Sequence, residues 1–437
     1  MKINKSVSEI KNMKYQESFI IFFKKLFSFF NQMPKEKIPK EEENYLKIGD
    51  KGGLIFESRQ TINFDLLIKG NIGIITKWTE YSALSENAIL LSATGVKLED
   101  KDNFELNNNY IRPIVNILYK KFNRSFKFDK ELALNQYMLI ENYIYSDDLL
   151  YTVKAPIYNL EIEEDIIKIE DKICLKKIEE ADLNLFKASL MSFGYGIDYS
   201  LISCKTVIVT EDKIKKGEAF IIGQDTISNI NRTISSLSIY NKNTIGVGPF
   251  FSKPKNFWSM FSGIYSSFMP NETHIHYEKN NFKKKDIKIF KIFWEKYNDS
   301  VKNNPWLDLA GRRLLRMFYK MRIEDRFVDI MIIFEMLFLP EGNVELKYRL
   351  SVRAALLLGK NYKEKKYIFE LFKLSYDIRS SIVHDGLVSS QNERKLKKLG
   401  INLNELYKKL LLYLFESIEI LAKKPVIRGK FEDIIFQ

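Results

Sequence analysis

The sequence predicts an α+β protein, in which a mixed N-terminal region with substantial β-structure is followed by an all-α bundle. Three observations support this division. Runs of β-branched and aromatic residues broken by glycine and asparagine fill much of the chain before residue 280. After it, apolar residues recur at three- and four-residue spacing. The length of 437 residues exceeds the usual size of one hydrophobic core, so more than one domain is expected.

Residues 1–46 are predicted to form a helix followed by a charged linker. The segment ESFIIFFKKLFSFFNQM has an apolar face, but Lys24 and Lys25 interrupt it well short of the roughly 20 apolar residues that a membrane span needs. No small-residue cleavage site follows it. A packed amphipathic helix is therefore expected, with peripheral membrane contact as the alternative. The proline-bearing, charged stretch PKEKIPKEEENY is interpreted as the linker.

Residues 47–285 are predicted to form a mixed α/β region with a sensing or regulatory role. Strands are expected in GGLIFESRQ, TINFDLLIKG and NIGIITKW, and again in APIYNLEIEEDIIKIEDKICLKKI, KTVIVTED and KGEAFIIGQ. Within the longest of these, DIIKIEDKICL has the polar alternation of a hairpin. A helix is expected near residues 109–122, begun or kinked at Pro113.

Residues 286–437 are predicted to form a bundle of about six helices, entered through the charged junction EKNNFKKKDIK. Prolines and glycines at 340, 342, 359 and 386 mark helix ends. This region holds 29 Lys and Arg against 20 Asp and Glu, an excess of 9 out of the chain's +13. Any site for a polyanion is therefore expected in the bundle.

Composition and motifs restrict the other classes of function. Cys174 and Cys204 have no partner at metal-ligand spacing, which favours thiols in a reducing compartment and a cytoplasmic protein. The glycines form neither GxGxxG nor GxxxxGK, so no cofactor is expected. His274 and His276 would share one face of a strand as a metal pair does, with Glu272 and Glu278 nearby, but an ordinary polar strand face is the preferred interpretation.

The segment SYDIRSSIVHDG ends the fifth helix of the bundle and carries one of three histidines. Arg379 lies at the edge of the apolar stripe of this helix, whereas His384 lies on the side away from the core. Five residues leave the two side chains about 140° apart on an ideal helix. They can meet only if the arginine wraps around, if the last turn is distorted, or if a second protomer contributes its own copies. A surface histidine that complements the helix dipole is the simpler alternative.

Three features together resemble the Apea-like branch of the HEPN (higher eukaryotes and prokaryotes nucleotide-binding) superfamily. They are an acidic residue within an apolar helix, Glu335, the arginine-bearing helix YRLSVRAALLLG, and YDIRSSIVHDG, which is similar to the Arg-Ser-x-x-Val-His-Gly pattern of that branch. The resemblance covers roughly residues 300–425. Two positions depart from it: Ser380 stands where many HEPN nucleases have Asn, Asp or His, and Asp385 separates the histidine from Gly386.

The resemblance implies a metal-independent endoribonuclease that acts as a homodimer on RNA, with tRNA as one possible substrate. By position it assigns catalysis to Arg379 and His384, with Ser380 and Asp385 beside them. Proteins of this kind look like bacterial toxins or anti-phage (abortive infection) effectors, which implies that the N-terminal region senses a trigger or restrains the nuclease. Two alternatives are a non-catalytic module that binds RNA or a nucleotide, and a scaffold in which the bundle serves only dimerisation.

These residues suit RNA cleavage without a metal. The reaction needs a base for the 2′-hydroxyl, an acid for the departing 5′-oxygen and a cation for the phosphorane, and it leaves a 2′,3′-cyclic phosphate and a 5′-hydroxyl. An imidazole can exchange protons near neutral pH, and a guanidinium offers a planar fork to phosphate oxygens. Glu335 is expected to need a cationic partner: Arg349 or Arg353 in a structural ion pair, or else Arg379 or His384, which it would orient.

Overall fold

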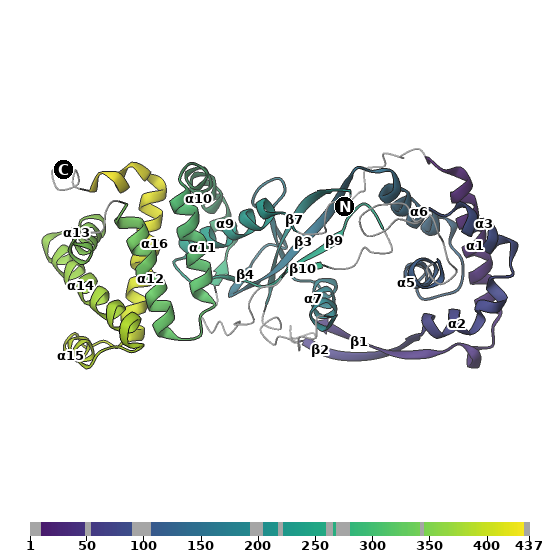
Figure 1. Cartoon of the computed structure of the whole chain (residues 1–437), viewed down its shortest axis with the longest axis horizontal. Helices are drawn as coiled ribbons and strands as arrows, with labels where there is room; N and C mark the ends of the chain where they lie inside the picture. The colour runs from purple at the N-terminus through teal and green to yellow at the C-terminus, as the bar shows by residue number, and fades with distance from the viewer. Residues whose placement is uncertain are drawn as a thin grey trace.

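The computed structural model describes residues 10–48, 54–89, 106–192, 204–216, 222–258, 265–267, 280–340 and 345–431. The molecule is elongated, with N-terminal helices at one end, an antiparallel sheet in the middle and the C-terminal helices at the other end (Figure 1). All described strands lie before residue 283, together with several helices. After residue 283 the regular structure of the described chain is helical. The predicted α+β class is therefore confirmed.

The N-terminal end is a small helical module with an aromatic core. Its elements are α1 (Met13–Gln32), α2 (Phe64–Ile75), α3 (Thr79–Asn87), the π-helical turn η2 (Leu106–Ile111), α5 (Arg112–Lys121) and α6 (Lys130–Tyr145). The predicted amphipathic packing of α1 is confirmed, because its apolar face is fully buried while Lys24 is exposed. Pro113 lies in the first turn of α5, as predicted. No helix among the described residues is long and apolar enough to cross a membrane.

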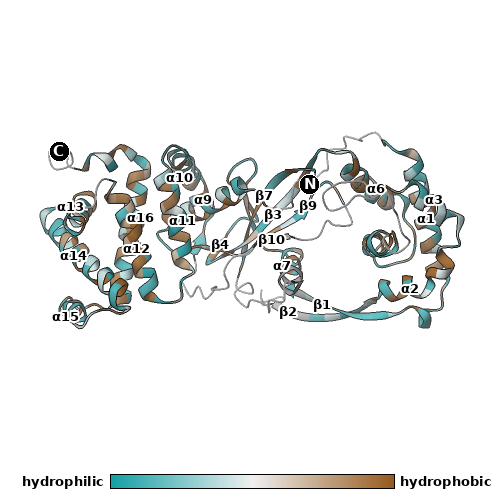
Figure 2. Ribbon diagram, viewed as in Figure 1, coloured by the Kyte–Doolittle hydropathy of each residue, from teal (hydrophilic) through white to brown (hydrophobic). Residues whose placement is uncertain are grey.

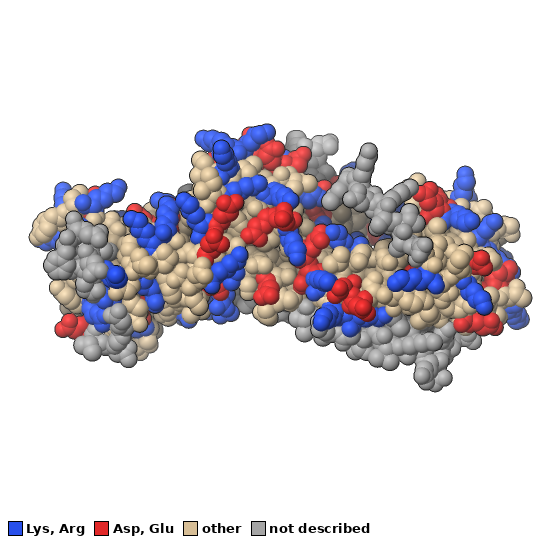
Figure 3. Space-filling model, turned by 90° about the horizontal axis from the view of Figure 1, so that it is seen from above, with Lys and Arg blue, Asp and Glu red and all other residues tan. Residues whose placement is uncertain are grey.

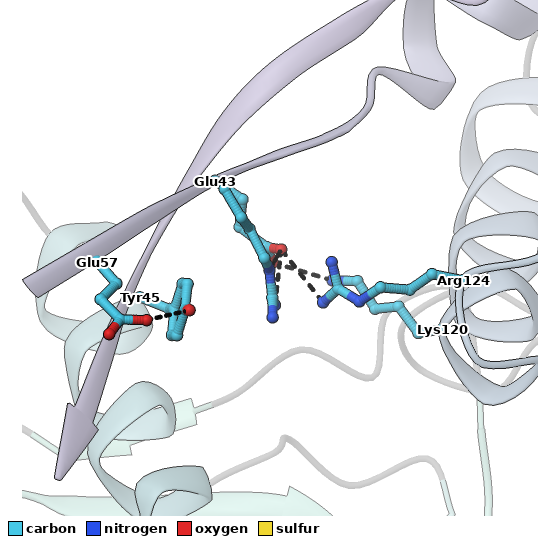
Figure 4. A network of polar contacts seen from close by, with 6 residues as sticks. Glu43, Tyr45, Glu57, Lys120 and Arg124 are labelled. Carbon is cyan, nitrogen blue, oxygen red and sulfur yellow. Dashed lines mark hydrogen bonds and ion pairs between the residues drawn. The ribbon is translucent and has the colours of Figure 1, made fainter. Parts of the chain in front are cut away.

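The predicted linker at 35–46 is wrong, because most of it is a β-strand. After a short 3₁₀ turn, η1 (Lys35–Lys37), strand β1 (Lys40–Ile48) pairs antiparallel with β2 (Leu54–Ile62). Cross-strand pairs explain why so charged a sequence is extended: Glu43 faces Arg59, and Tyr45 faces Glu57 and donates a hydrogen bond to it (Figure 4). The domain boundary predicted after residue 46 therefore falls inside β1.

The strands predicted in TINFDLLIKG and NIGIITKW are also wrong beyond Thr61 and Ile62, which end β2, because Phe64–Ile75 forms α2. The side chain of Asn63 accepts a hydrogen bond from the Leu66 amide and begins the helix. Gly70 and Gly73 have open space where a side chain would be, so each costs only its helix propensity, about 1 kcal/mol. Burial of apolar side chains such as Leu67 and Ile68, roughly 1.5–3 kcal/mol each, offsets that cost.

The central sheet is antiparallel. Its strand order is β10-β9-β3-β7-β6-β5, and β8 also pairs with β3. The bounds are β3 (Asp148–Tyr158), β5 (Ile166–Lys168), β6 (Cys174–Lys177), β7 (Thr206–Lys215), β8 (Gly246–Val247), β9 (Phe250–Pro254) and β10 (Tyr265–Ser267). Strands β4 (Leu160–Ile162) and β11 (Asn280–Phe282) form a separate parallel pair.

Two strand predictions in this sheet are confirmed. The predicted hairpin is β5–β6, with Ile167 opposite Leu175, and KTVIVTED lies in β7. Most of KGEAFIIGQ lies outside the described residues. Two helices lie between strands of this sheet along the chain. Helix α7 (Glu180–Ser192) comes between β6 and β7, and α9 (Gln224–Asn241) comes between β7 and β8. The sequence analysis identified neither helix.

The C-terminal end is the predicted helical bundle. Its helices are α10 (Lys284–Asn303), α11 (Pro305–Phe318), α12 (Ile323–Phe338), α13 (Leu346–Leu358), α14 (Tyr362–Asp385), α15 (Ser390–Lys398) and α16 (Leu403–Lys423), followed by the 3₁₀ turn η3 (Pro425–Gly429). The six predicted helices are confirmed, and α15 is an addition. Helices α12, α13 and α14 end next to the predicted stops.

The bundle and the sheet share one hydrophobic core. Helix α9 packs against α10, α11 and α16, and a continuous cluster of buried side chains runs from Val153 on β3 to Phe431. The approach of α11 to α9 is close: a side chain at Gly311 would meet the Tyr297 hydroxyl at 2.8 Å and Ser235 at 3.2 Å. Apolar ribbon faces turn inward along this stretch (Figure 2). The predicted division at residue 286 therefore does not separate two hydrophobic cores.

Candidate active site at the end of helix α14

Helix α14 positions the residues assigned to catalysis. It begins at Asn361, whose side chain accepts a hydrogen bond from the Glu364 amide. It ends at Gly386, whose left-handed backbone (φ 74°) closes the helix with a hydrogen bond from its amide to the Ile382 carbonyl. The predicted apolar stripe is confirmed, since its residues are all buried: Ile368, Leu371, Phe372, Ile378 and Ile382.

Arg379 turns toward α12 and forms an ion pair with Glu335. Its Nη2 lies 3.7 Å from Glu335 Oε2, and the two side chains are 25 % and 23 % exposed. This separation is too long for a hydrogen bond. Glu335 Oε1 and Arg379 Nε are both buried and have no hydrogen-bond partner. The guanidinium is therefore held near a carboxylate while part of its donor capacity is unused.

The environment of Glu335 is more apolar than that of an ordinary surface carboxylate. Burial raises the pKa of Glu335 above its usual value, and the positive charge of Arg379 offsets only part of that rise. Among the cationic partners predicted for Glu335, Arg379 is the one that faces it. Arg353 is engaged elsewhere: its Nη1 donates a hydrogen bond of 2.6 Å to the Phe338 carbonyl, and its guanidinium lies over the Phe431 ring. Arg349 lies half-buried on α13.

The other residues assigned to the site lie on the outer side of α14. His384 and Asp385 are exposed in the last turn, and Ser380 is half-buried one turn earlier. Within one chain, Arg379 faces α12 while His384 faces outward. The single chain thus presents the two side chains on different sides of the helix end, as the spacing predicted.

A basic helix that the sequence analysis did not identify lies beside this region. Helix α15 packs against α14 and exposes four cations: Arg394, Lys395, Lys397 and Lys398. The Lys395 ammonium lies 3.6 Å from Asp377 on α14, and Lys347 on α13 contacts the same carboxylate at 2.5 Å. Figure 3 views the molecule from the side opposite α15, and Lys and Arg also predominate over Asp and Glu on that face of the helical end. Leu396 is the one buried apolar residue of α15, so the helix has no apolar periodicity in the sequence. Its charge is the only signal that could have indicated it.

Other candidate sites receive little support. His274, His276, Glu272 and Glu278 lie outside the described residues. In the described ranges, no group of three His, Cys, Asp or Glu side chains could hold a metal ion. Cys204 is buried, and Cys174 is half-buried, with burial raising the pKa of its thiol.

Comparisons with known proteins identified no relative: no family model, no curated protein and no solved structure matches the chain. The resemblance to HEPN proteins therefore rests on the residue patterns described above.

Proposed function

We propose that the C-terminal bundle is a metal-independent endoribonuclease of the HEPN type that acts as a homodimer. The observation that carries the proposal is the state of Arg379. It is a partly buried cation beside Glu335, it has an unused donor at Nε, and His384 follows it by five residues at an exposed helix end. A structural arginine at this depth is expected to have its donors satisfied. An arginine that must bind a phosphate keeps donors available for it, and because Nε is buried, the phosphate approaches the exposed quarter of the Arg379 side chain in this proposal.

The proposed chemistry assigns one task to each group. The His384 imidazole takes the proton of a 2′-hydroxyl, or returns one to the departing 5′-oxygen. The Arg379 guanidinium binds the oxygens of the phosphorane, whose negative charge exceeds that of the substrate. Glu335 touches neither substrate nor product; it positions the guanidinium. DNA is not cleaved, because it lacks the attacking hydroxyl.

Two copies of the chain are needed in this proposal. Arg379 and His384 lie about 140° apart around α14, so one helix end offers either group to a phosphate but not both on one face. A two-fold axis beside the C-terminal turn brings the histidine of one protomer toward the arginine of the other. The expected dimer therefore forms through the bundle.

The test compares purified wild-type protein with His384→Ala and Arg379→Ala on total RNA and on tRNA, with chelator present. Wild-type protein should yield 2′,3′-cyclic phosphate and 5′-hydroxyl ends, and both variants should lose about 10²–10⁴-fold in rate. His384 is exposed, so its variant should remain folded. Equal cleavage by wild type and His384→Ala, or loss of cleavage in chelator, would contradict the mechanism.

A non-catalytic RNA-binding module is the second candidate. It is favoured by the exposed cations of α15 and by the outward position of His384 within one chain. In that case the protein should shift RNA and leave it intact even when a trigger is supplied. A bundle that dimerises without binding RNA would instead indicate a scaffold.

We further propose a role as a cytoplasmic toxin or anti-phage effector that the N-terminal region restrains. Because α9 packs on α10, α11 and α16, removal of residues 1–285 would strip part of the bundle's core. Restraint is therefore better tested on the full chain, by sequencing RNA ends in cells that express it with and without phage. RNA ends that appear only after infection would support restraint, and equal ends in both conditions would contradict it.

A further inference from the structure

A groove of about 740 Å³ runs between the first turn of α13 and the middle of α14. Its lining consists of two tyrosines, two lysines, one leucine and one glutamate: Tyr348, Tyr376, Lys347, Lys373, Leu346 and Glu345. Lysines, which are depleted at protein–protein interfaces, lie beside aromatic rings around this largely open depression. Neither the ion pair of Arg379 nor the proposed chemistry of His384 uses these residues.

Tyr348 presents a supported and accessible ring in this groove. Its side chain is 57 % exposed, and its ring packs edge-to-face on Phe369 with the centroids 5.8 Å apart. Lys373 lies 5.1 Å above the same Phe369 ring, so the lysine and the tyrosine both contact one half-buried aromatic side chain. An exposed aromatic ring held at its edge is a ready surface for stacking.

Beside the groove, Asp377 is the one carboxylate partner of two lysines. Lys347 and Lys395 share this single carboxylate, at 2.5 Å and 3.6 Å. The Lys373 ammonium lies 3.9 Å from the carboxylate of the exposed Glu370. An ion pair this long in solvent is weak. Glu345 is the acidic member of the lining and lies at the N-cap of α13. A ligand with both flat rings and regularly spaced negative charge fits this pattern.

The groove is aligned with His384. Lys373, Tyr376, Ser380 and His384 follow one another at spacings of three, four and four residues, which places them on one stripe of α14. Eight residues separate Tyr376 from His384, which corresponds to about 12 Å along the helix. A nucleic-acid strand that is held in the groove and follows this stripe would reach the His384 imidazole within a few nucleotides.

We propose that the Tyr348–Tyr376 groove binds a single-stranded RNA segment adjacent to the phosphate that is cleaved, with bases stacked on the tyrosines and phosphates at Lys347 and Lys373. This inference rests on the proposed ribonuclease function and names its substrate class. Bases in an RNA duplex are paired and stacked on one another, so they are not available to the tyrosines. The chain therefore selects unpaired regions such as loops and ends.

The test measures binding by the full-length His384→Ala protein, using a fluorescent 12-nucleotide oligouridine and a 12-base-pair RNA duplex in chelator. The single strand should bind more tightly than the duplex. Tyr348→Ala in this background should weaken its binding roughly tenfold. Tyr362→Ala is the matched control, because Tyr362 is 80 % exposed in the first turn of the same helix, far from the groove, and should change nothing. Equal affinity of the Tyr348→Ala and Tyr362→Ala proteins would overturn the proposal, as would equal binding of the duplex.

Failure of this inference and failure of the nuclease proposal give different results. If wild-type protein cleaves RNA but Tyr348→Ala binds and cleaves normally, the groove proposal is wrong and the nuclease stands. If Tyr348→Ala weakens binding while wild-type protein and His384→Ala leave RNA equally intact, both in purified form and in phage-infected cells, the groove is an RNA-binding site and the nuclease proposal is wrong. Crosslinking of a 4-thiouridine strand supplies a separate readout, with the adduct expected at Tyr348 or Tyr376.

Discussion

Glu335 on α12 and Arg379 on α14 face each other across the helix interface, with Oε2 and Nη2 3.7 Å apart and without a hydrogen bond between them. Each side chain is about three-quarters buried, so neither charge is fully solvated. A partly buried pair with unfilled hydrogen bonds stabilises a fold little, because desolvation offsets the Coulomb attraction. Its effect is to fix where the guanidinium lies.

A double-mutant cycle should show that Glu335 and Arg379 interact directly. Glu335→Ala and Arg379→Ala each leave a partly buried charge without its partner, so the coupling energy should be about 0.5–2 kcal/mol in urea unfolding. The pair Glu335→Ala with Arg353→Ala is the comparison, because Arg353 donates to the Phe338 carbonyl. A larger coupling with Arg353 than with Arg379 would contradict the observed pairing.

Glu335 should make stability fall as pH rises. Burial raises the pKa of Glu335 in the folded chain above its ordinary value of 4.5, so the folded state holds this proton over a pH window in which the unfolded state has released it. Within that window the contribution of Glu335 is greatest at low pH and declines as pH rises through the folded pKa. The unfolding free energy of wild-type protein, measured relative to that of Glu335→Gln, should therefore fall as the pH rises from 4 through the raised pKa of folded Glu335. A constant difference across urea titrations from pH 4 to 8 would refute this.

Glu43 should hold the β1–β2 hairpin to α5. Its carboxylate lies 2.8 Å from Arg59, 3.4 Å from Lys120 and 3.5 Å from Arg124 (Figure 4). Burial alone would raise the pKa of Glu43, but the hydrogen bond from Arg59 and the charges of Lys120 and Arg59 lower it. Glu43→Gln should cost about 0.5–1 kcal/mol at neutral pH and speed amide hydrogen exchange in the hairpin.

The contribution of Glu43 should disappear in acid, since a lowered pKa gives stability that is lost as pH falls through it. Glu42→Gln is the matched control, because Glu42 is the exposed neighbour of Glu43 on the same strand. Equal hydrogen exchange in the Glu43→Gln and Glu42→Gln proteins would show that the charge cluster does not hold the hairpin.

Gly386 should be needed for the end of α14. Its φ of 74° is a conformation that costs other residues about 1 kcal/mol or more, and a side chain there would meet nothing within 4 Å. Gly386→Ala should therefore lower the unfolding free energy by about 1 kcal/mol through backbone strain alone. Gly429→Ala is the control, because that glycine also has open space around it but lacks a positive φ. Similar melting temperatures for the two variants would exclude the strain.

Periodicity predicted those helices whose burial decides their conformation. Helices α10 to α14 and α16 each turn an apolar stripe to the core, so their pattern and their stops were readable. Helix α15 was missed because it buries little besides Asn392 and Leu396. Helix α2 was predicted as strands because its β-branched residues favour extended structure and its glycines disfavour a helix, whereas its packing favours a helix. Strand β1 was missed because its charges are matched by side chains outside the strand, on β2 and at the end of α5.

The sequence by itself determined the α+β class, the helical bundle, the buried stripe of α14 and the outward position of His384, because these depend on residue spacing along one element. The tertiary structure alone decided that Glu335 faces Arg379, that α9 joins the sheet to the bundle in one core, and that Tyr348 and Tyr376 line a common groove. Each of these is a contact between elements distant in sequence. Such contacts are fixed by the packing of whole surfaces, which no local pattern of residues contains.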